Sequence, residues 1–305
     1  MVDITHKIIT QRIATAQAIV KVGSVDTIKA INNKTVPKGD VLEVSRTAGL
    51  FAVKNTSNAI PDCHPMPIEF TGIQFEVLED SVLIEVTVKT IYKTGVEVEA
   101  MHGASIVALT MYDMLKPIDK QVEISTVKLL SKKGGKSDFG KREIDNLSIA
   151  VIVCSDSVSS GKKEDRAGKV LVEKMDKLGY EVGLYIIIPD EVNQIQEQIT
   201  NLSLQQTDLI LITGGTGLSP RDITPEAVIP MLDRRIPGIE EAIRSYGQER
   251  TPYAMLSRSV VGFKENTLIM ALPGSTSGAS ESMDAVFPSI LHLFRIIKGH
   301  NHDKK

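Results

Sequence analysis

The loop from Ile212 to Glu226 carries the residues of this chain that are best suited to chemistry. It follows a short apolar strand expected over 208–213 and reads Ile-Thr-Gly-Gly-Thr-Gly-Leu-Ser-Pro-Arg-Asp-Ile-Thr-Pro-Glu. The glycines let backbone N–H groups approach an anion closely. Thr224, as N-cap, and Pro225 predict the start of a helix, whose free N–H groups also favour negative charge. Asp222 would repel a phosphate unless a hard cation such as Mg²⁺ bridges them, so the loop predicts a site for nucleotide and magnesium.

The same loop excludes two common nucleotide-binding motifs. No Gly-Lys-Ser/Thr sequence follows the glycines, as it would in a P-loop, and the Gly-x-Gly-x-x-Gly spacing of dinucleotide folds is missing. A tight turn between strand and helix remains the alternative for the glycines taken alone. Asp222 and Glu226 favour the ligand site over that alternative.

The composition is that of an ordinary globular protein. Its 305 residues are the length of about two domains, and 42% of them are hydrophobic. A net charge of −3, 4% aromatic residues and no tryptophan argue against a nucleic-acid partner. The apolar runs are far shorter than a membrane span and Met1-Val2-Asp3 opens no signal peptide, so we expect a cytoplasmic protein with no membrane partner. The two cysteines, Cys63 and Cys154, fit a reducing compartment and cannot alone form a thiolate zinc site.

The chain divides where hydrophobic periodicity stops, between Leu130 and Arg142. We predict an N-terminal domain over 1–138, a linker over 139–146 and a C-terminal domain over 147–305. In the first domain, alternation predicts strands over 68–78, 82–91 and 122–129, and helical periodicity predicts helices over 39–52 and 96–115. This pattern is typical of an α+β fold, here a ferredoxin-like antiparallel sheet with helices.

The second domain alternates buried strands with amphipathic helices. Strands are expected at 149–154, 182–188, 209–213 and 268–272, and helices at 166–178, 191–202, 225–232, 238–249 and 278–297. Such alternation is typical of a three-layer α/β fold with a mostly parallel sheet. Ligands of open sheets bind beyond the carboxyl ends of the strands. We therefore expect three segments to converge on one pocket: Gly214 to Asp222, Pro189-Asp190 and Pro273-Gly274-Ser275.

Polar clusters in the first domain suggest acid–base chemistry without a metal. They are Lys38-Gly39-Asp40, Cys63-His64-Pro65, Gly95 to Ala100 and Tyr112 to Lys116. A solvated helix face is the alternative for Glu97, His102 and Lys116 taken singly. A zinc site is the weaker alternative, because Glu99 and His102 have no Cys or His pair beside them. Asp62 would raise the basicity of His64 if the two side chains pair.

Glu99 and Asp113 would lie on nearly the same face of the helix expected over 96–115. They are fourteen residues apart, which separates them by about 21 Å along the axis. Two such helices packed antiparallel across a twofold axis would bring Glu99 of one subunit near Asp113 and Lys116 of another. We therefore predict that a site using these residues is shared between subunits.

Several of these clusters occur together, and in order, in one protein family. Residues 1 to about 138 resemble cyclic pyranopterin monophosphate synthase, the MoaC family, through Met1-Val2-Asp3, Lys38-Gly39-Asp40-Val41, Cys63-His64-Pro65, Thr94-Gly95-Val96-Glu97, Tyr112-Asp113-Met114 and Leu129 to Ser137. The resemblance implies conversion of a cyclised dihydro-GTP into cyclic pyranopterin monophosphate and pyrophosphate, with no cofactor, at a site shared across a dimer. It assigns catalysis to Lys38, His64, Glu97, Glu99, Asp113 and Lys116, and substrate binding to Cys63, Lys132 and Lys136. The family usually has Leu and Met where this chain has Asp62 and Val98.

A second family accounts for the rest of the chain. Residues 147 to about 298 resemble the MoaB/MogA molybdopterin adenylyltransferases through Ser155-Asp156, Asp165-Arg166-Ala167-Gly168, Ile188-Pro189-Asp190-Glu191, the loop over 213–226 and Leu272-Pro273-Gly274-Ser275. The resemblance implies that ATP and Mg²⁺ adenylylate the terminal phosphate of molybdopterin. It assigns catalysis and the metal to Asp190 and Asp222. Substrate binding would fall to Thr213, Gly214, Gly215, Thr216, Gly217, Ser219, Glu226, Gly274 and Ser275.

Together the two resemblances predict a bifunctional enzyme of molybdenum cofactor biosynthesis, with pterin and nucleotide substrates. One alternative is a pterin-binding or scaffold protein of the same pathway in which one domain is inactive. Another is a nucleotide-binding regulatory protein, which would bind ATP without pterin. By analogy with the hexamers of the first family, we expect a homo-hexamer.

Overall fold

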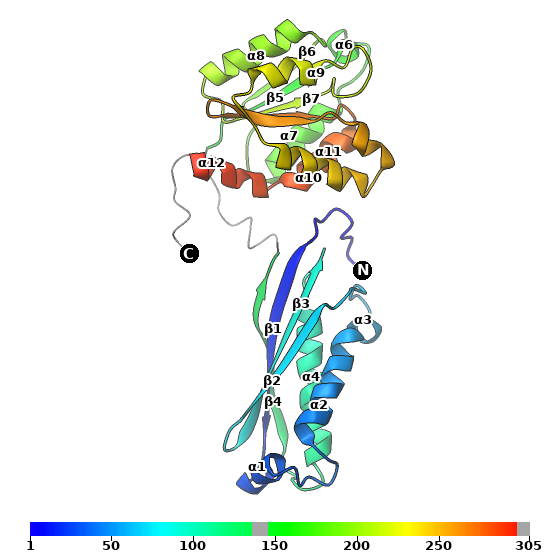
Figure 1. The fold of residues 1–305 in the computed structure, drawn as a ribbon, viewed down its shortest axis with the longest axis vertical. Helices are drawn as coiled ribbons and strands as arrows, with labels where there is room; N and C mark the ends of the chain where they lie inside the picture. The colour runs from blue at the N-terminus through cyan, green and yellow to red at the C-terminus, as the bar shows by residue number, and fades with distance from the viewer. Residues whose placement is uncertain (136–145, 298–305) are drawn as a thin grey trace. The chain divides into compact units, whose positions relative to one another are not determined.

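The computed structural model of the chain describes residues 1–135 and 146–297 (Figure 1). The chain forms two compact units, residues 1–139 and 140–305, each with a hydrophobic core of its own. The linker expected over 139–146 lies outside the described residues except for Asn146, so its limits stay a prediction. In the described part of the chain, no helix has the length and apolar character needed to span a bilayer.

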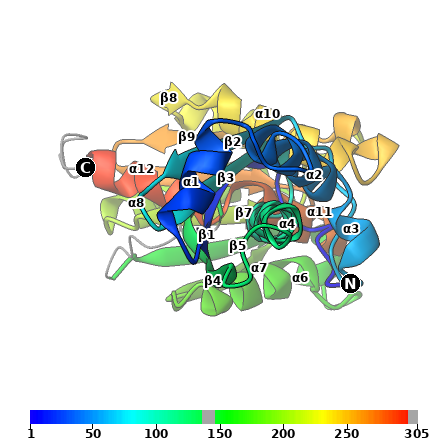
Figure 2. The ribbon, with the colours of Figure 1, turned by 90° about the horizontal axis from the view of Figure 1, so that it is seen from below.

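The N-terminal unit is a four-stranded antiparallel sheet covered by helices. Figures 1 and 2 show the two long helices, α2 and α4, lying side by side against the sheet. The strands lie in the order β2-β3-β1-β4. This architecture confirms the α+β prediction, and the ferredoxin-like arrangement stays a prediction. The elements are β1 (Thr10–Lys21), α1 (Val25–Asn32), α2 (Val41–Lys54), α3 (Thr56–Ala59), β2 (Phe70–Val77), β3 (Ser81–Tyr92), α4 (Glu97–Leu115) and β4 (Glu123–Lys133).

Helix α4 is held along its whole length by a face of small apolar residues. Ala100, Ala104, Val107 and Ala108 are fully buried, at the spacing of one helix face. The helix ends just before Pro117, which lacks a backbone N–H to continue it. Because α4 is 19 residues long, its first turn and its last turn present their side chains at two distant places.

Strand β1 lies in the middle of the sheet, and the sequence patterns did not predict it. Its inward positions are Ala14, Ala16 and Ala18, all buried. Alanine has a low preference for strands, so apolar alternation was weak in this segment. The small side chains are placed where α4 packs on the central strand, and the tertiary contact outweighs the local preference.

The C-terminal unit is a six-stranded sheet between two layers of helices. Its order is β6-β5-β7-β10-β9-β8. The first four strands are parallel, β9 is antiparallel to β10, and β8 is antiparallel to β9. Figure 1 shows α8 and α9 on one face and α7, α10 and α11 on the other, which confirms the three-layer, mostly parallel prediction. The elements are β5 (Ile149–Cys154), α6 (Asp156–Ser159), α7 (Ala167–Lys177), β6 (Leu184–Ile188), α8 (Val192–Leu204), β7 (Leu209–Thr213), α9 (Thr224–Val228), η1 (Ile229–Met231), β8 (Arg234–Arg235), α10 (Pro237–Gln248), η2 (Pro252–Leu256), β9 (Val260–Lys264), β10 (Thr267–Leu272), α11 (Thr276–Val286), η3 (Ser289–Leu291) and α12 (His292–Ile297).

Two local predictions for this unit were wrong. The helix expected over 278–297 is broken after Val286, because Pro288 cannot continue an α-helix. Thr224 is not an N-cap, since α9 begins at Thr224 itself and Ile223 precedes it without a side-chain cap. The Thr224 hydroxyl instead donates to the Gly214 carbonyl oxygen at 2.8 Å. It therefore ties the two ends of the glycine loop together.

Candidate functional site

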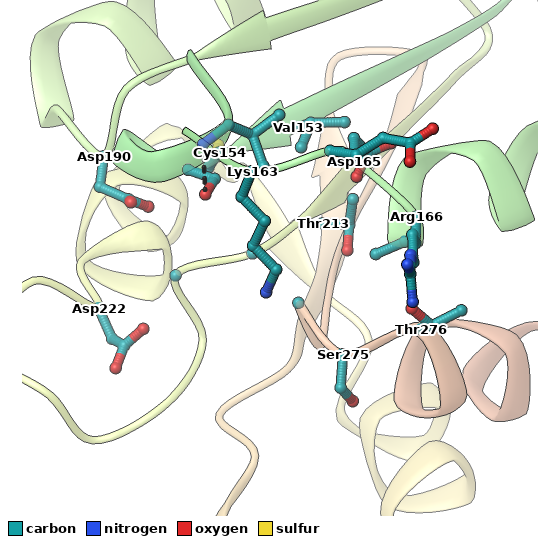
Figure 3. A pocket seen from close by; sticks show the side chains of 17 residues that line it. Val153, Cys154, Lys163, Asp165, Arg166, Asp190, Thr213, Asp222, Ser275 and Thr276 are labelled. Atoms are coloured by element: carbon teal, nitrogen blue, oxygen red, sulfur yellow. Dashed lines mark hydrogen bonds between the residues drawn. The ribbon is translucent and has the colours of Figure 1, made fainter. Parts of the chain in front are cut away.

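A cavity of about 620 Å³ lies at the carboxyl ends of the parallel strands in the C-terminal unit (Figure 3). Side chains and backbone from separate segments line it, among them Cys154, Asp165, Arg166, Asp190, Thr213, Gly214, Gly215, Asp222, Gly274 and Ser275. The three segments that were expected to converge therefore border one space. Its volume is within the range of roughly 300 to 1,000 Å³ that small-molecule sites occupy.

The glycines of the loop after β7 bring backbone to the cavity wall. Gly214 and Gly215 have φ values of +105° and +62°, which residues with a Cβ rarely adopt. A Cβ on Gly214 would collide with the carbonyl oxygen of Cys154, and one on Gly215 would collide with the Thr224 hydroxyl. The loop is thus packed directly on β5 and on the start of α9. It presents backbone rather than side chains to a ligand, as an anion cradle requires.

Asp190 is a half-buried carboxylate in the lining of this cavity. Its Oδ2 accepts a hydrogen bond from the backbone N–H of Asp156 at 3.0 Å, and its own N–H donates to Asp156 Oδ1 at 3.1 Å. Its Oδ1 is buried and has no hydrogen-bond partner in the described part of the chain. Burial raises the pKa of Asp190, and the negative charges of Asp156 and Asp222 raise it further. The hydrogen bond from the Asp156 N–H acts in the opposite direction and lowers this pKa. A buried, unpartnered carboxylate oxygen calls for a cation or a donor from a ligand.

Asp222 borders the cavity on the same side as Asp190, as Figure 3 shows. Its Oδ2 accepts from the Ser219 N–H at 2.7 Å, which fixes the carboxylate within its own loop. Within residues 1–135 and 146–297, no cluster of three or more His, Cys, Asp or Glu side chains could hold a metal ion. Two aspartates suffice for Mg²⁺, which is commonly held by one or two carboxylates together with substrate phosphates and water. The residues present therefore fit a magnesium ion that arrives with a nucleotide.

Four of the expected binding residues lie outside the lining of the cavity: Thr216, Gly217, Ser219 and Glu226. They support the loop instead. Arg258 donates to the Gly217 carbonyl at 2.8 Å and to the Asp222 carbonyl, and it pairs with Glu226. Arg221 pairs with Asp156 at 2.7 Å. The sequence patterns gave neither arginine a role, although Arg221 lies within the loop itself.

The cavity also has basic residues that were not assigned to the site. Lys163 and Arg166 line it, and Figure 3 shows the Lys163 side chain extending into the open space. Asp165 fixes this segment by accepting from the N–H groups of Gly168 and Lys169, each at 3.1 Å. The Asp165-Arg166-Ala167-Gly168 motif was the available signal for Arg166, whereas nothing local distinguished Lys163 from other surface lysines.

In the N-terminal unit, three expected residues meet at the C-terminal end of α4. Lys38 Nζ lies 2.6 Å from Asp113 Oδ2, and Lys116 Nζ lies 2.7 Å from Asp113 Oδ1. The hydrogen bonds from Lys116 and Lys38 lower the pKa of Asp113 to about 2. All three side chains are partly exposed, so this is an accessible cluster with the carboxylate held as an anion.

A second group lies at the first turn of α4. Glu99 is 2% exposed, and its Oε1 accepts from the Cys63 thiol at 3.0 Å. Its Oε2 is buried without a partner among the described residues. Burial raises the pKa of Glu99, and burial together with the Glu99 carboxylate raises the pKa of Cys63 to about 12. Cys63 thus positions Glu99 in this chain by holding one carboxylate oxygen.

Glu97 belongs to a separate basic cavity of about 240 Å³. Lys132 pairs with it at 3.3 Å, and the lining also includes Lys7, Arg12, Lys93 and Lys133. Arg12 is 8% exposed and donates to the Tyr92 carbonyl. In the sequence, the only sign of a role for Arg12 was that a charged residue lies within the segment that forms β1. Lys136, also expected here, lies outside the described residues.

His64 and Asp62 make contacts other than the expected one. His64 Nε2 lies 2.8 Å from the Val2 carbonyl oxygen, and Asp62 pairs with the Met1 amino group at 3.1 Å. Asp62 is 89% exposed. The Asp62 carboxylate therefore faces solvent and the Met1 amino group. The His64 ring makes its hydrogen bond with the backbone of Val2.

Two protein-family models match the chain. The model described as "MoaC family" matches residues 1–135, and the model described as "Probable molybdopterin binding domain" matches residues 150–292. Over nearly its whole length the chain is similar to a molybdenum cofactor biosynthesis bifunctional protein of Chlorobaculum tepidum. The two are 39% identical over 302 residues, which cover 99% of this chain and 96% of that protein. The chain belongs to the family of bifunctional molybdenum cofactor biosynthesis proteins.

Each unit of this bifunctional family member is also similar to single-domain proteins. The N-terminal unit is 49% identical over 139 residues to a cyclic pyranopterin monophosphate synthase of Clostridium perfringens, a match that covers 45% of this chain and 87% of that protein. A crystal structure of the molybdopterin biosynthesis enzyme MoaB from Thermus thermophilus matches with 39% identity and a TM-score of 0.48, over 50% of this chain and 98% of that one. The two family models and the full-length relative confirm the MoaC part and the MoaB/MogA part that the motifs suggested.

Proposed function

We propose that the C-terminal unit of this bifunctional family member transfers the adenylyl group of ATP to the terminal phosphate of molybdopterin, with Mg²⁺, and releases pyrophosphate. The observation that carries the proposal is the pairing of a backbone-built glycine loop with the buried, unpartnered Oδ1 of Asp190 in one cavity. Backbone N–H groups favour phosphate, and a carboxylate beside phosphate is useful when a cation lies between them.

The residues of the cavity divide the work of phosphoryl chemistry. Gly214, Gly215 and Ser275 bind phosphate oxygens, and Lys163 and Arg166 neutralise their charge. Asp190 and Asp222 hold the Mg²⁺, which supplies charge stabilisation to the transferring phosphoryl group. Positioning and electrostatics supply most of the rate in such reactions. Arg258 keeps the loop in the conformation that presents Asp222.

We propose that the N-terminal unit forms cyclic pyranopterin monophosphate and pyrophosphate from a cyclised dihydro-GTP. Lys38, Lys116 and the basic cavity beside Glu97 suit a triphosphate. Glu99, with its raised pKa, suits a proton transfer, and Asp113 suits the positioning of Lys38 and Lys116. The two groups lie at opposite ends of α4, about 21 Å apart along its axis. The proposal therefore includes a site shared between subunits of a homo-hexamer.

Formation of adenylylated molybdopterin by the purified chain tests the transferase. It should require ATP and Mg²⁺, and Asp222→Ala should lower it by about 10²- to 10³-fold, the range for removing one electrostatic contact to a transition state. Asp176→Asn, which removes an exposed carboxylate from α7 outside the cavity, is the matched control and should keep the wild-type rate. A folded wild-type chain that binds molybdopterin but forms no product would make this unit a pterin carrier or scaffold.

A further inference from the structure

The two aspartates that suit a magnesium ion come from different loops. Asp190 follows β6, and Asp222 belongs to the loop between β7 and α9. Both border the cavity on the same side (Figure 3). Residues 218–221 of the second loop are exposed, so packing does little to fix them. The separation of the two carboxylates therefore depends on polar contacts that tie one loop to the other.

Asp156, which follows β5, holds Asp190 in place. The two residues exchange hydrogen bonds, because the backbone N–H of each donates to the carboxylate of the other, at 3.0 and 3.1 Å. This exchange uses Oδ2 of Asp190 and leaves its buried Oδ1 without a partner among the described residues. Asp156 therefore fixes the direction of the carboxylate oxygen that is available to a cation.

Arg221, next to Asp222 in the sequence, is bound to the same Asp156. Its Nε and Nη2 both donate to Asp156 Oδ2, at 2.9 and 2.7 Å, and Nη2 also lies 3.3 Å from Glu191 Oε1. Two charge-assisted donors on one carboxylate fix the planar guanidinium more firmly than a single contact. Arg221 thus connects the glycine loop to the residue that holds Asp190 and to the residue that follows Asp190.

Arg258, which also contacts this loop, makes a different connection. It donates to the carbonyl groups of Gly217 and Asp222 and pairs with Glu226. These three partners lie in the loop itself or in α9, which follows it. Arg258 therefore fixes the shape of the loop, whereas the connection from the loop to Asp190 runs through Arg221.

We propose that the ion pair between Arg221 and Asp156 positions the two aspartates and thereby sets the affinity of the cavity for a divalent cation. The proposal rests on the proposed function, because it assumes that these carboxylates hold Mg²⁺ together with the nucleotide. It deepens that function by giving a role to two residues that do not line the cavity. Contacts that orient metal ligands change metal affinity by about 10- to 100-fold. Both side chains of the pair are about half exposed, so we expect the lower end of that range.

Two titrations of the full chain with α,β-methylene-ATP, one with Mg²⁺ and one with EDTA, test the proposal without turnover. The analogue has a phosphorus–carbon bond where adenylyl transfer would break a phosphorus–oxygen bond. The ratio of the two dissociation constants reports the affinity of the protein–nucleotide complex for Mg²⁺. Arg221→Gln should lower this ratio by about tenfold, and Arg221→Lys, which keeps the charge on a single donor group, should lower it less. Lys29→Gln, which breaks an exposed ion pair with Asp26 in the N-terminal unit, is the matched control and should leave the ratio unchanged.

A double variant shows whether Arg221 acts through Asp156. Asp156→Asn keeps an oxygen for the Asp190 N–H and loses the charge that holds Arg221, so it should lower the ratio about as much as Arg221→Gln. The double variant should then be no worse than either single variant. In transferase assays, Arg221→Gln should raise the apparent KM for Mg²⁺ by about tenfold with little change in kcat. A general loss of structure would instead lower kcat at saturating Mg²⁺.

Three outcomes would overturn the proposal. They are a ratio that is unchanged in Arg221→Gln, effects of the two single variants that add in the double variant, and a wild-type chain whose affinity for the nucleotide does not depend on Mg²⁺. If the ratio is unchanged in the variants while the wild-type chain forms adenylylated molybdopterin, the proposed function stands without this positioning role. If the ratio falls as expected but the wild-type chain forms no adenylylated product, the pair positions a site for metal and nucleotide, and the transferase proposal fails.

Discussion

The two units handle charge in different ways, although both are expected to act on phosphorylated pterins or their precursors. In the C-terminal unit, separate segments meet at one edge of the sheet, so one cavity contains the glycine loop and both aspartates. In the N-terminal unit, the charged groups are spread along α4, with Glu99 at its start and Asp113 at its end. A parallel sheet gathers loops at one edge, whereas a single helix keeps its two ends apart.

The surroundings of the carboxylates differ between the units in the same way. Burial raises the pKa of Asp190, while hydrogen bonds from two lysines lower that of Asp113. One Asp190 oxygen has no hydrogen-bond partner among the described residues, whereas Asp113 pairs with two lysines. The cavity of the C-terminal unit is lined by residues of one chain. For the N-terminal unit, we propose that a second chain brings the ends of two helices together.

Mixing two inactive variants would test the requirement for a second chain, and it has the largest expected effect. Glu99→Ala and Asp113→Ala should each lower the rate of the N-terminal reaction by about 10²- to 10⁴-fold. Oligomers re-formed from an equal mixture should recover about a quarter of the wild-type rate, because about half of the dimers are mixed and each mixed dimer has one intact site of two. Synthase assays before and after dissociation would measure this. No recovery in mixed oligomers would place the whole site in one chain.

A substitution in the glycine loop should disrupt the C-terminal site through packing alone. Gly214→Ala adds a Cβ that collides with the Cys154 carbonyl at a φ of +105°, and it should lower the free energy of unfolding by about 3 kcal/mol. Gly179→Ala, at a φ of +86° with nothing within 4 Å, has the backbone strain without the collision and should lower it by about 1 to 2 kcal/mol. Guanidinium unfolding followed by circular dichroism measures both. Equal losses would mean that the loop can move away from β5.

The buried pair at the start of α4 can be probed through its thiol. With its pKa raised to about 12, Cys63 should react slowly with iodoacetamide at pH 8.5, and Glu99→Gln should speed the reaction by about tenfold because it removes the neighbouring negative charge. Cys154, buried and with its own pKa raised to about 12, is an internal reference that should not change. Mass spectrometry of the alkylated peptides gives both rates. An unchanged rate at Cys63 would argue against its contact with Glu99.

The smallest effect is expected at the exposed lysine cluster. Lys116→Gln removes one of the two lysine hydrogen bonds, so the pKa of Asp113 should rise from about 2 toward its ordinary value of 3.8. Because the folded-state pKa is lowered, the contribution of the cluster to stability is present above about pH 4 and is lost as the pH falls toward 2. Carboxyl NMR titration of Asp113 measures the shift. Lys34→Gln, which breaks the separate pair with Asp40, should leave Asp113 unchanged.

Much of the fold could be predicted because its signals are local. Continuous apolar runs marked β5 and β7, and the period of buried residues marked α4. Strand β1 was not predicted, because its alanines suit contact with α4 and have a low preference for strands. Strand β9 was not predicted either, because the expected strands did not include its antiparallel pairing with β10. In the site, the aspartates and glycines could be recognised by type and spacing. Lys163 and Arg258 could not, because a lone charged residue has no local pattern.

By itself, the sequence determined the two fold classes, the glycine loop with its aspartates, and the likeness to two families. These features depend on residue type, on periods of two or about 3.6 residues and on short ordered motifs, all of which are written along the chain. Only the tertiary structure decided which charges have partners: Asp113 receives two lysines, and Asp190 has one oxygen without a partner in the described residues. The physical reason is that burial and pairing arise between segments distant in sequence, and the sheet and helix packing alone brings those segments together.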